Sequence, residues 1–394
     1  MTNMKLNTFP IAKLPFDLIE NVLSFSIEHK GSKVIGSQLI YVCLMFAKAA
    51  IPHFWRHLYL EEPTQKKIFA ILHGNPSKRM FNYHGMVKSV TICPVWISNM
   101  KSGGLLRTLD IVLSNLPNLT RIHIEDKLSF CHNYHLNKEA TTEQLADLLC
   151  KKDLKELILD SDHLVFNDEL LEIVSSQSRG LKMLSLNGPH FSDEGIMEYV
   201  IPNLKDDLVE FSAGHGGINP ITLTGNTVLA LLENCPKLKR ILLEGVDLSD
   251  SDFIGEDLPL SNLEYLWLGK TSHQNFTAKG LASLLMTCNE SLVSLVLDLS
   301  HVSSLVLQDI IIPLFQHQKL RELHLVSASW AEWSAYYPRP RSEHEVRAKE
   351  AMLCWKLKAY WGITHDLIDL IGEKIPTLKV FSILGENHLK AGLF

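Results

Sequence analysis

Apolar residues recur along this chain in a Leu-x-x-Leu-x-Leu spacing, with anchors at the first, fourth and sixth positions. Ten segments follow this spacing, and their first anchors are Val87, Leu119, Leu154, Leu181, Leu208, Leu238, Leu263, Leu292, Leu320 and Leu378. From the first segment to the ninth the interval averages about 29 residues, a period typical of repeat architectures. Because side chains alternate across a strand, each segment predicts a β-strand with its anchors on one face.

A helical pattern precedes most of these strands. The apolar sets, spaced three or four residues apart, are Leu145/Leu148/Leu149, Leu170/Leu171/Val174, Ile196/Tyr199/Val200, Val228/Leu231/Leu232, Leu281/Leu284/Leu285, Ile310/Ile311/Leu314 and Leu367/Leu370/Ile371. Thr141 and Ser192 are expected to cap two of these helices. The segment Ser249–Pro259 is short and acidic, so we expect its repeat to lack a full helix.

One strand and one helix cannot bury an apolar core alone, so such repeats must stack on one another. Stacking predicts an α/β solenoid with a parallel sheet inside and helices outside. Two copies, Asn234-Cys235-Pro236-Lys237-Leu238 and Thr287-Cys288-Asn289-Glu290-Ser291-Leu292, resemble the cysteine-containing leucine-rich repeats. This resemblance implies a leucine-rich-repeat solenoid over residues 86–394, preceded by a connector at 61–85.

Residues 1–60 do not follow the repeat period, and the segment from Leu14 to Leu60 is expected to be helical. Pro15 suits the first turn of a helix, and Pro52 is expected to interrupt a later one. Three stretches in order resemble an F-box: Leu14-Pro15-x-Asp17-Leu18-Ile19-x-x-Val22-Leu23, Tyr41-Val42-Cys43 and Trp55-Arg56-x-Leu58-Tyr59-Leu60. The expected organisation is therefore a small helical F-box-like domain followed by the solenoid.

F-box proteins use this helical unit to bind a Skp-type adaptor. The resemblance implies an adaptor-binding face made of Leu14, Pro15, Leu18, Ile19, Val22 and Leu23. With leucine-rich repeats behind it, the chain resembles the substrate-recognition subunit of an SCF-type cullin-RING E3 ubiquitin ligase. A simpler alternative is that the segment only caps the open end of the solenoid. The protein would then be a protein-interaction scaffold with no link to ubiquitination.

Composition and charge narrow the classes of partner and compartment. The formal net charge is −6, so general binding to nucleic acid or to an acidic membrane surface is not expected, although a local basic patch is compatible with this total. The seven cysteines are scattered and form no C-x-x-C pair, which favours reduced thiols over disulfides or zinc. With no signal peptide and no long apolar run, we expect a cytoplasmic or nuclear protein.

The inner face of the predicted sheet is acidic. Alternation places the third, fifth and seventh positions of each segment on this face. They include Glu125, Glu156, Asp160, Glu210, Glu244, Asp298 and Glu322, against the cations Arg121 and Arg240. Tyr265 and Trp267 add an aromatic spot. These positions predict a binding surface for a basic target protein; the alternative is that the charges only keep the sheet solvated.

An aromatic-rich insertion interrupts the period between Leu320 and Leu378, at about residues 329–362. Its leading candidates for target binding are Trp330, Trp333, Tyr336, Tyr337, Arg339 and Arg341, because tryptophan, tyrosine and arginine dominate binding hot spots. The alternative is that these rings seal the last repeats, an explanation that fits Trp355 and Trp361 best.

Catalytic motifs fail on inspection. Gly269-Lys270-Thr271 resembles the end of a P-loop, but Glu264 stands where the first glycine is required. His344-Glu345 begins a zincin pattern that Ala348 ends. We therefore expect no catalytic residue, no cofactor and no metal. An enzyme with a site assembled on the inner face is the remaining, third hypothesis.

Overall fold

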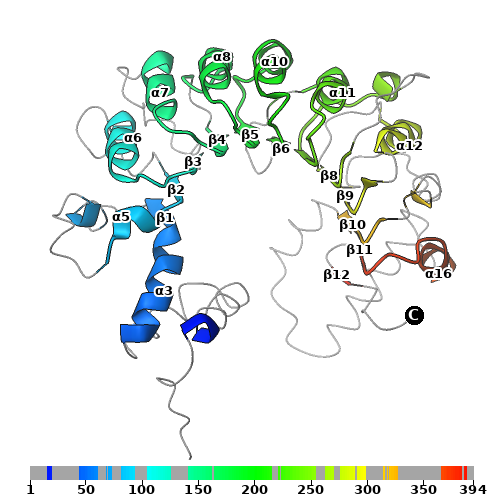
Figure 1. Ribbon diagram of the computed structural model, residues 1–394. Helices are drawn as coiled ribbons and strands as arrows, with labels where there is room; N and C mark the ends of the chain where they lie inside the picture. Colours follow the sequence, from blue (N-terminus) through cyan, green and yellow to red (C-terminus); the bar gives the residue numbers. More distant parts are fainter. Residues whose placement is uncertain are drawn as a thin grey trace, which may run out of the picture. The chain divides into compact units, whose positions relative to one another are not determined.

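The computed structural model describes residues 16–19, 44–60, 68, 70–72, 81–93, 104–125, 141–161, 164–214, 221, 223–253, 262–269, 276–288, 291–298, 314–315, 317, 319–326, 365–383 and 386–387. The chain divides into two compact units, Met1–Ile124 and Glu125–Phe394. Figure 1 labels their helices and strands. The predicted insertion at 329–362 lies outside the described residues, and so do all of its aromatic candidates.

The described part of the first unit contains three parallel strands that pair in chain order. Residues 16–19 are helical. The elements that follow are α3 (Leu44–Arg56), β1 (His57–Leu60), α5 (Tyr83–Met86), β2 (Ser89–Ile92), α6 (Gly104–Asn115) and β3 (Arg121–Glu125), whose last residue lies past the boundary. Leu58 pairs with Val90 and Val90 with Ile122, so the anchors of neighbouring strands stack in register.

Two features of this unit differ from the sequence prediction. His57–Leu60 forms strand β1, with Leu58 and Leu60 buried and Tyr59 exposed, where a helix was expected. Helix α3 continues through Pro52, where an interruption was expected. Proline removes one backbone hydrogen bond from a helix. Ala49, Ala50 and Ile51 are buried beside it, and their packing outweighs that loss.

The second unit is a longer run of the same architecture. Its strands are β4 (Glu156–Asp160), β5 (Met183–Asn187), β6 (Glu210–Ala213), β7 (Arg240–Leu243), β8 (Tyr265–Leu268), β9 (Ser294–Asp298), β10 (Glu322–Val326), β11 (Val380–Ile383) and β12 (Glu386–Asn387). Strands β4 to β11 are parallel and pair in chain order, and β12 closes antiparallel on β11. The predicted α/β solenoid of the leucine-rich-repeat type is therefore confirmed.

The helices of this unit lie on one side of the strands (Figure 1). They are α7 (Thr142–Leu149), α8 (Asp168–Gln177), α9 (Asp193–Gly195), a π turn (Ile196–Val200), α10 (Ile201–Leu204), α11 (Gly225–Asn234), α12 (Ala278–Thr287) and α16 (His365–Lys374). The acidic linker joins β7 to β8, and its segment Asp250–Phe253 is a single 3-10 turn. No full helix was expected in this repeat, and the described part of the linker contains none.

The anchors form the core between strands and helices. In nine of the ten predicted sets all three anchors are at most 3% exposed. The helix anchors meet them from the other side, since Leu145, Leu170, Val228 and Leu284 are also buried. Among the helix anchors whose burial the structure describes, Tyr199 is half-buried and Leu370 is exposed on α16, while its neighbour Ile371 is buried. Burial of these side chains is the main stabilising term of the fold.

A row of aspartates ties the start of one helix to the start of the next. Asp168, the first residue of α8, accepts hydrogen bonds from the backbone N–H and hydroxyl of Ser192. Asp193 likewise accepts from Thr224 N–H and the Thr227 hydroxyl. Asp250 accepts from Thr277 and from Gly280 N–H. Each carboxylate satisfies donors that a helix N-terminus leaves free, and its charge suits the helix dipole.

The described cysteines are Cys93, Cys150, Cys235 and Cys288, and all four are free thiols. Burial raises the pKa of Cys235 to about 11, so this thiol stays protonated and unreactive at neutral pH. Within the part of the chain that the structure describes, no helix has both the length and the apolar character needed to cross a bilayer.

The first prediction concerns the aspartate row. Gly195 lies so close to Asp168 that a Cβ on residue 195 would overlap the carboxylate. Gly195→Ala should lower the free energy of unfolding by about 1–3 kcal/mol, the range for overpacking. In an Asp168→Ala background the same substitution should cost less, since the carboxylate is gone and only the Cβ of residue 168, 2.9 Å away, remains in its path. Urea unfolding midpoints of the four proteins measure this coupling, and additive effects would contradict it.

Candidate functional site

The inner face of the second unit consists of the third, fifth and seventh positions of its repeats, on the side away from the helices. Parallel pairing aligns equivalent positions into rows that cross the strands. The third-position row from β4 to β10 reads Glu156, Met183, Glu210, Arg240, Tyr265, Ser294 and Glu322. These side chains are fixed at strand spacing, about 4.8 Å apart.

Arg240 is the centre of this row. Its Nε lies 3.1 Å from Oε2 of Glu210 on β6, and its guanidinium stacks 4.7 Å from the ring centre of Tyr265 on β8. The guanidinium plane suits both a carboxylate and an aromatic face. Three neighbouring strands therefore hold an acid, a cation and a ring in one rigid line.

The phenol of Tyr265 is held neutral. Burial raises its pKa, the carboxylates of Glu322 and Glu210 add to that rise, and the cation of Arg240 opposes it. Further along the same row, the Ser294 hydroxyl donates to Oε2 of Glu322 at 3.0 Å. Tyr265 thus presents a neutral ring with a hydroxyl among charged neighbours.

The fifth-position row beside it is apolar at its centre, between Ser212 on β6 and His324 on β10. Leu242 on β7, Trp267 on β8 and Val296 on β9 are register partners, and all three are half-buried. Trp267 lies two residues from Tyr265 on the same strand face, as its position predicted. This row gives the inner face an apolar strip next to the Glu210–Arg240–Tyr265 line, the combination found at binding hot spots.

Glu244 stands at the seventh position, between two glycines on the neighbouring repeats. Gly214 has a positive φ of 75°, and a Cβ there would overlap the carbonyl oxygen of Glu244. Gly269 lies close to the Glu244 side chain from the other side. Glycine at both positions leaves the half-buried carboxylate without bulky neighbours in its row.

The six described target-binding candidates all lie on the inner face, but the structure joins only some of them. Glu210 and Tyr265 meet through Arg240, a residue that sequence reasoning treated only as a stray cation. Glu156 lies two strands from Glu210, and Glu322 is exposed at the far end of the row. Two of the acids counted on this face, Glu125 and Asp298, are buried. The sequence could have indicated the role of Arg240, because aligning the third positions of successive repeats places it between Glu210 and Tyr265.

Trp330, Trp333, Tyr336, Tyr337, Arg339 and Arg341 lie outside the described residues. Their role in recognition stays a prediction.

The adaptor-binding candidates belong to the first unit, and only two of them are described. Leu18 is 50% exposed and Ile19 is 2% exposed, so the short helix at 16–19 has one outward and one inward apolar side chain. Phe16, which the sequence reasoning did not include, is 40% exposed beside Leu18. Leu14, Pro15, Val22 and Leu23 lie outside the described residues.

No protein-family model matches this chain, and no curated protein matches it. Among solved structures, the chain is similar to one from the crystal structure of the Rad7 and Elc1 complex in yeast. The two are 15% identical, the match covers 95% of each chain, and the TM-score is 0.38. The fold assignment rests instead on the strands, helices and buried anchors described above.

The second prediction concerns the pKa of Tyr265. Arg240→Gln removes the cation that favours the phenolate and leaves the charge of Glu210 uncompensated, so the pKa should rise further. The measurement is an ultraviolet titration of tyrosinate, with Tyr265→Phe in the same background as the control that assigns the signal. A pKa that falls or stays constant would contradict the Arg240–Tyr265 contact.

Proposed function

We propose that this protein is the substrate-recognition subunit of an SCF-type cullin-RING E3 ubiquitin ligase. The observation that carries the proposal is the combination in one chain of the F-box-like stretches from Leu14 to Leu60 with a leucine-rich-repeat solenoid. In this proposal the first segment binds a Skp-type adaptor and the repeats bind a target protein.

The exposed apolar side chains near the N-terminus support the adaptor-binding part. Phe16 and Leu18 expose large apolar areas to water in the free chain. Covering them on a partner is favourable by roughly 25 cal/mol per Å² of apolar surface. Ile19 packs inward, so its contribution is to hold the short helix in place rather than to touch the adaptor.

The inner face of the second unit supports the target-binding part. It is built on strands, so its side chains are held in place before a target arrives, which lowers the entropy lost on binding. It presents the Glu210–Arg240–Tyr265 line, the apolar strip at Trp267 and the carboxylates Glu156, Glu244 and Glu322. This mixture favours a target segment with basic and aromatic or aliphatic residues.

Such a subunit performs no chemistry itself. Because it binds the adaptor and the target at once, target lysines and a ubiquitin-loaded enzyme are held in one complex and react as parts of one molecule. The gain is an effective concentration in the millimolar range for short, flexible links. The repeats need only hold the target, which agrees with a site of side chains that recognise rather than react.

A second candidate function is a leucine-rich-repeat scaffold with no link to ubiquitination. One observation favours it: Leu58 and Leu60 are buried as anchors of β1, which pairs in parallel with β2. The end of the F-box-like stretch thus continues the sheet, as a capping segment would. Adaptor binding separates the two functions.

The third prediction tests adaptor binding. Leu14→Asp with Leu18→Asp should abolish binding of a purified Skp-type adaptor, because charges on an apolar docking face become desolvated and unpaired. Isothermal titration calorimetry measures the affinity, and thermal unfolding shows that the repeats remain folded.

The matched control places the same charges on the second unit. Leu164 and Met286 are 70% and 55% exposed, and Leu164→Asp with Met286→Asp should leave the adaptor affinity unchanged. Wild-type affinity in the Leu14/Leu18 variant would rule out the F-box assignment and favour the scaffold.

A further inference from the structure

A second surface of the solenoid lies at the edge where its strands begin. This strand-start edge is made by two residues of each repeat, the one just before the first anchor and the one just after it. From β4 to β11 these positions hold seven cations and three carboxylates, in a chain whose net charge is −6. The cations are Lys155, Lys182, Lys237, Lys239, Lys319, Arg321 and Lys379. The edge is therefore opposite in sign to the inner face.

Backbone hydrogen bonds hold this edge in register. The carbonyl of the residue after each first anchor accepts two N–H groups from the next repeat. Lys155 O receives Lys182 N–H at 2.8 Å and Met183 N–H at 3.0 Å, and Arg321 O receives Lys379 N–H at 2.7 Å and Val380 N–H at 3.0 Å. The same pair of bonds recurs at Lys182, Val209, Lys239, Glu264 and Val293. The cationic side chains consequently leave the sheet from fixed, evenly spaced points.

The three carboxylates do not neutralise the edge. Asp153 lies 2.8 Å from Lys155, Asp207 lies 3.8 Å from Lys237, and Glu264 lies 2.6 Å from Lys239. The remaining four cations are exposed, and none has an ion-pair partner among the residues that the structure describes: Lys182, Lys319, Arg321 and Lys379. Exposed pairs such as Lys239–Glu264 are also weak, so these lysines can exchange partners.

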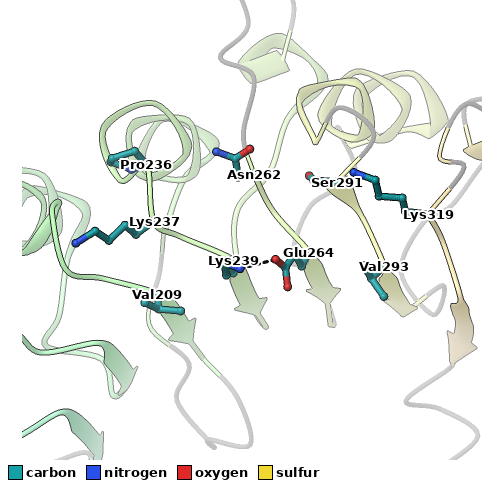
Figure 2. Close-up of a pocket in the computed structure, with 9 residues that line it drawn as sticks. All are labelled: Val209, Pro236, Lys237, Lys239, Asn262, Glu264, Ser291, Val293 and Lys319. Carbon is teal, nitrogen blue, oxygen red and sulfur yellow. Dashed lines mark hydrogen bonds and ion pairs between the residues drawn. The ribbon is translucent and has the colours of Figure 1, made fainter.

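A groove of about 540 Å³ follows this edge from β6 to β10. In Figure 2 the Lys239–Glu264 pair lies between Val209 and Val293, with Lys237 and Lys319 on the flanks. The groove thus combines apolar side chains with ammonium groups. Apolar contacts of this kind suit the side chains of a peptide better than a sugar-phosphate backbone, which would use the cations alone.

We propose that this basic groove, together with Lys182 and Arg321 on the strand-start edge outside its lining, binds an extended acidic segment of a partner protein. Carboxylates of the segment lie on Lys319, Arg321 and Lys182, and an apolar side chain lies over Val209 or Val293. Six strand intervals from β5 to β11 span about 29 Å, which about nine extended residues cover. The inference concerns the repeats alone and does not depend on adaptor binding. Its failure would leave the proposed function intact, and the reverse also holds.

The test uses the full chain and a fluorescein-labelled nonapeptide of alternating glutamate and leucine. Fluorescence anisotropy should show binding that weakens at least tenfold between about 50 mM and about 500 mM salt, because the contacts are exposed and screened. Lys319→Glu with Arg321→Glu should weaken binding at least tenfold. Lys319→Gln with Arg321→Gln, which adds no repulsion, should weaken it by a smaller factor and serves if the first variant does not fold.

The control pair carries the same charge change elsewhere. Arg107 lies on α6 of the first unit and Lys279 near the start of α12, and both are exposed. Arg107→Glu with Lys279→Glu should stay within twofold of wild type. Equal weakening in both pairs would overturn the proposal, since it would reflect net charge only. Equal or tighter binding of a nine-nucleotide single-stranded DNA would overturn it as well, since the cations would then act without the apolar side chains.

Discussion

Burial of three strand anchors per repeat against the neighbouring repeats is the constraint on which the rest of this structure depends. No repeat can cover its own apolar side, so each one is stable only between two others. The consequence is a fixed register, in which equivalent residues of successive repeats lie at one spacing along the sheet. Every surface described above, whether the inner face or the strand-start edge, is a set of equivalent positions read across strands.

Backbone N–H groups at the two ends of the strands in the second unit are satisfied by different acceptors. At the helix starts, Asp168, Asp193 and Asp250 satisfy the free N–H groups of the next repeat with carboxylates. At the strand starts, backbone carbonyls accept pairs of N–H groups, and no side chain is needed for that purpose. Ser291 and Thr377 still donate from their hydroxyls to the carbonyls of Leu263 and Leu320, but the lysines and arginine at the strand starts are not needed for these backbone bonds. In this chain lysine and arginine occupy many of those positions, which is why the edge can carry a function of its own.

The sequence predicted the strands well because their anchors are buried and therefore restricted to apolar types. Strand β1 was missed although Trp55, Leu58 and Leu60 have the same spacing, since a tryptophan stands in the leucine position and the stretch also fits an F-box. The predicted helix interruption at Pro52 was wrong, because the local preference of proline takes no account of the packing around a helix. Arg240 and the basic edge were missed for a shared reason. These charged residues are far apart along the sequence. The register of the strands places Arg240 beside Glu210 and Tyr265, and it places Lys319 at the groove.

The proposed role as a ligase subunit is tested most directly by the complex of this chain with a Skp-type adaptor and its cullin. The full chain, co-expressed with a Skp-type adaptor and its cullin, can be passed through size-exclusion chromatography with light scattering to give the mass of the complex. We expect one peak whose mass equals one copy each of the chain, the adaptor and the cullin. Elution of this chain apart from the adaptor, with the adaptor and cullin still together, would contradict the proposed function.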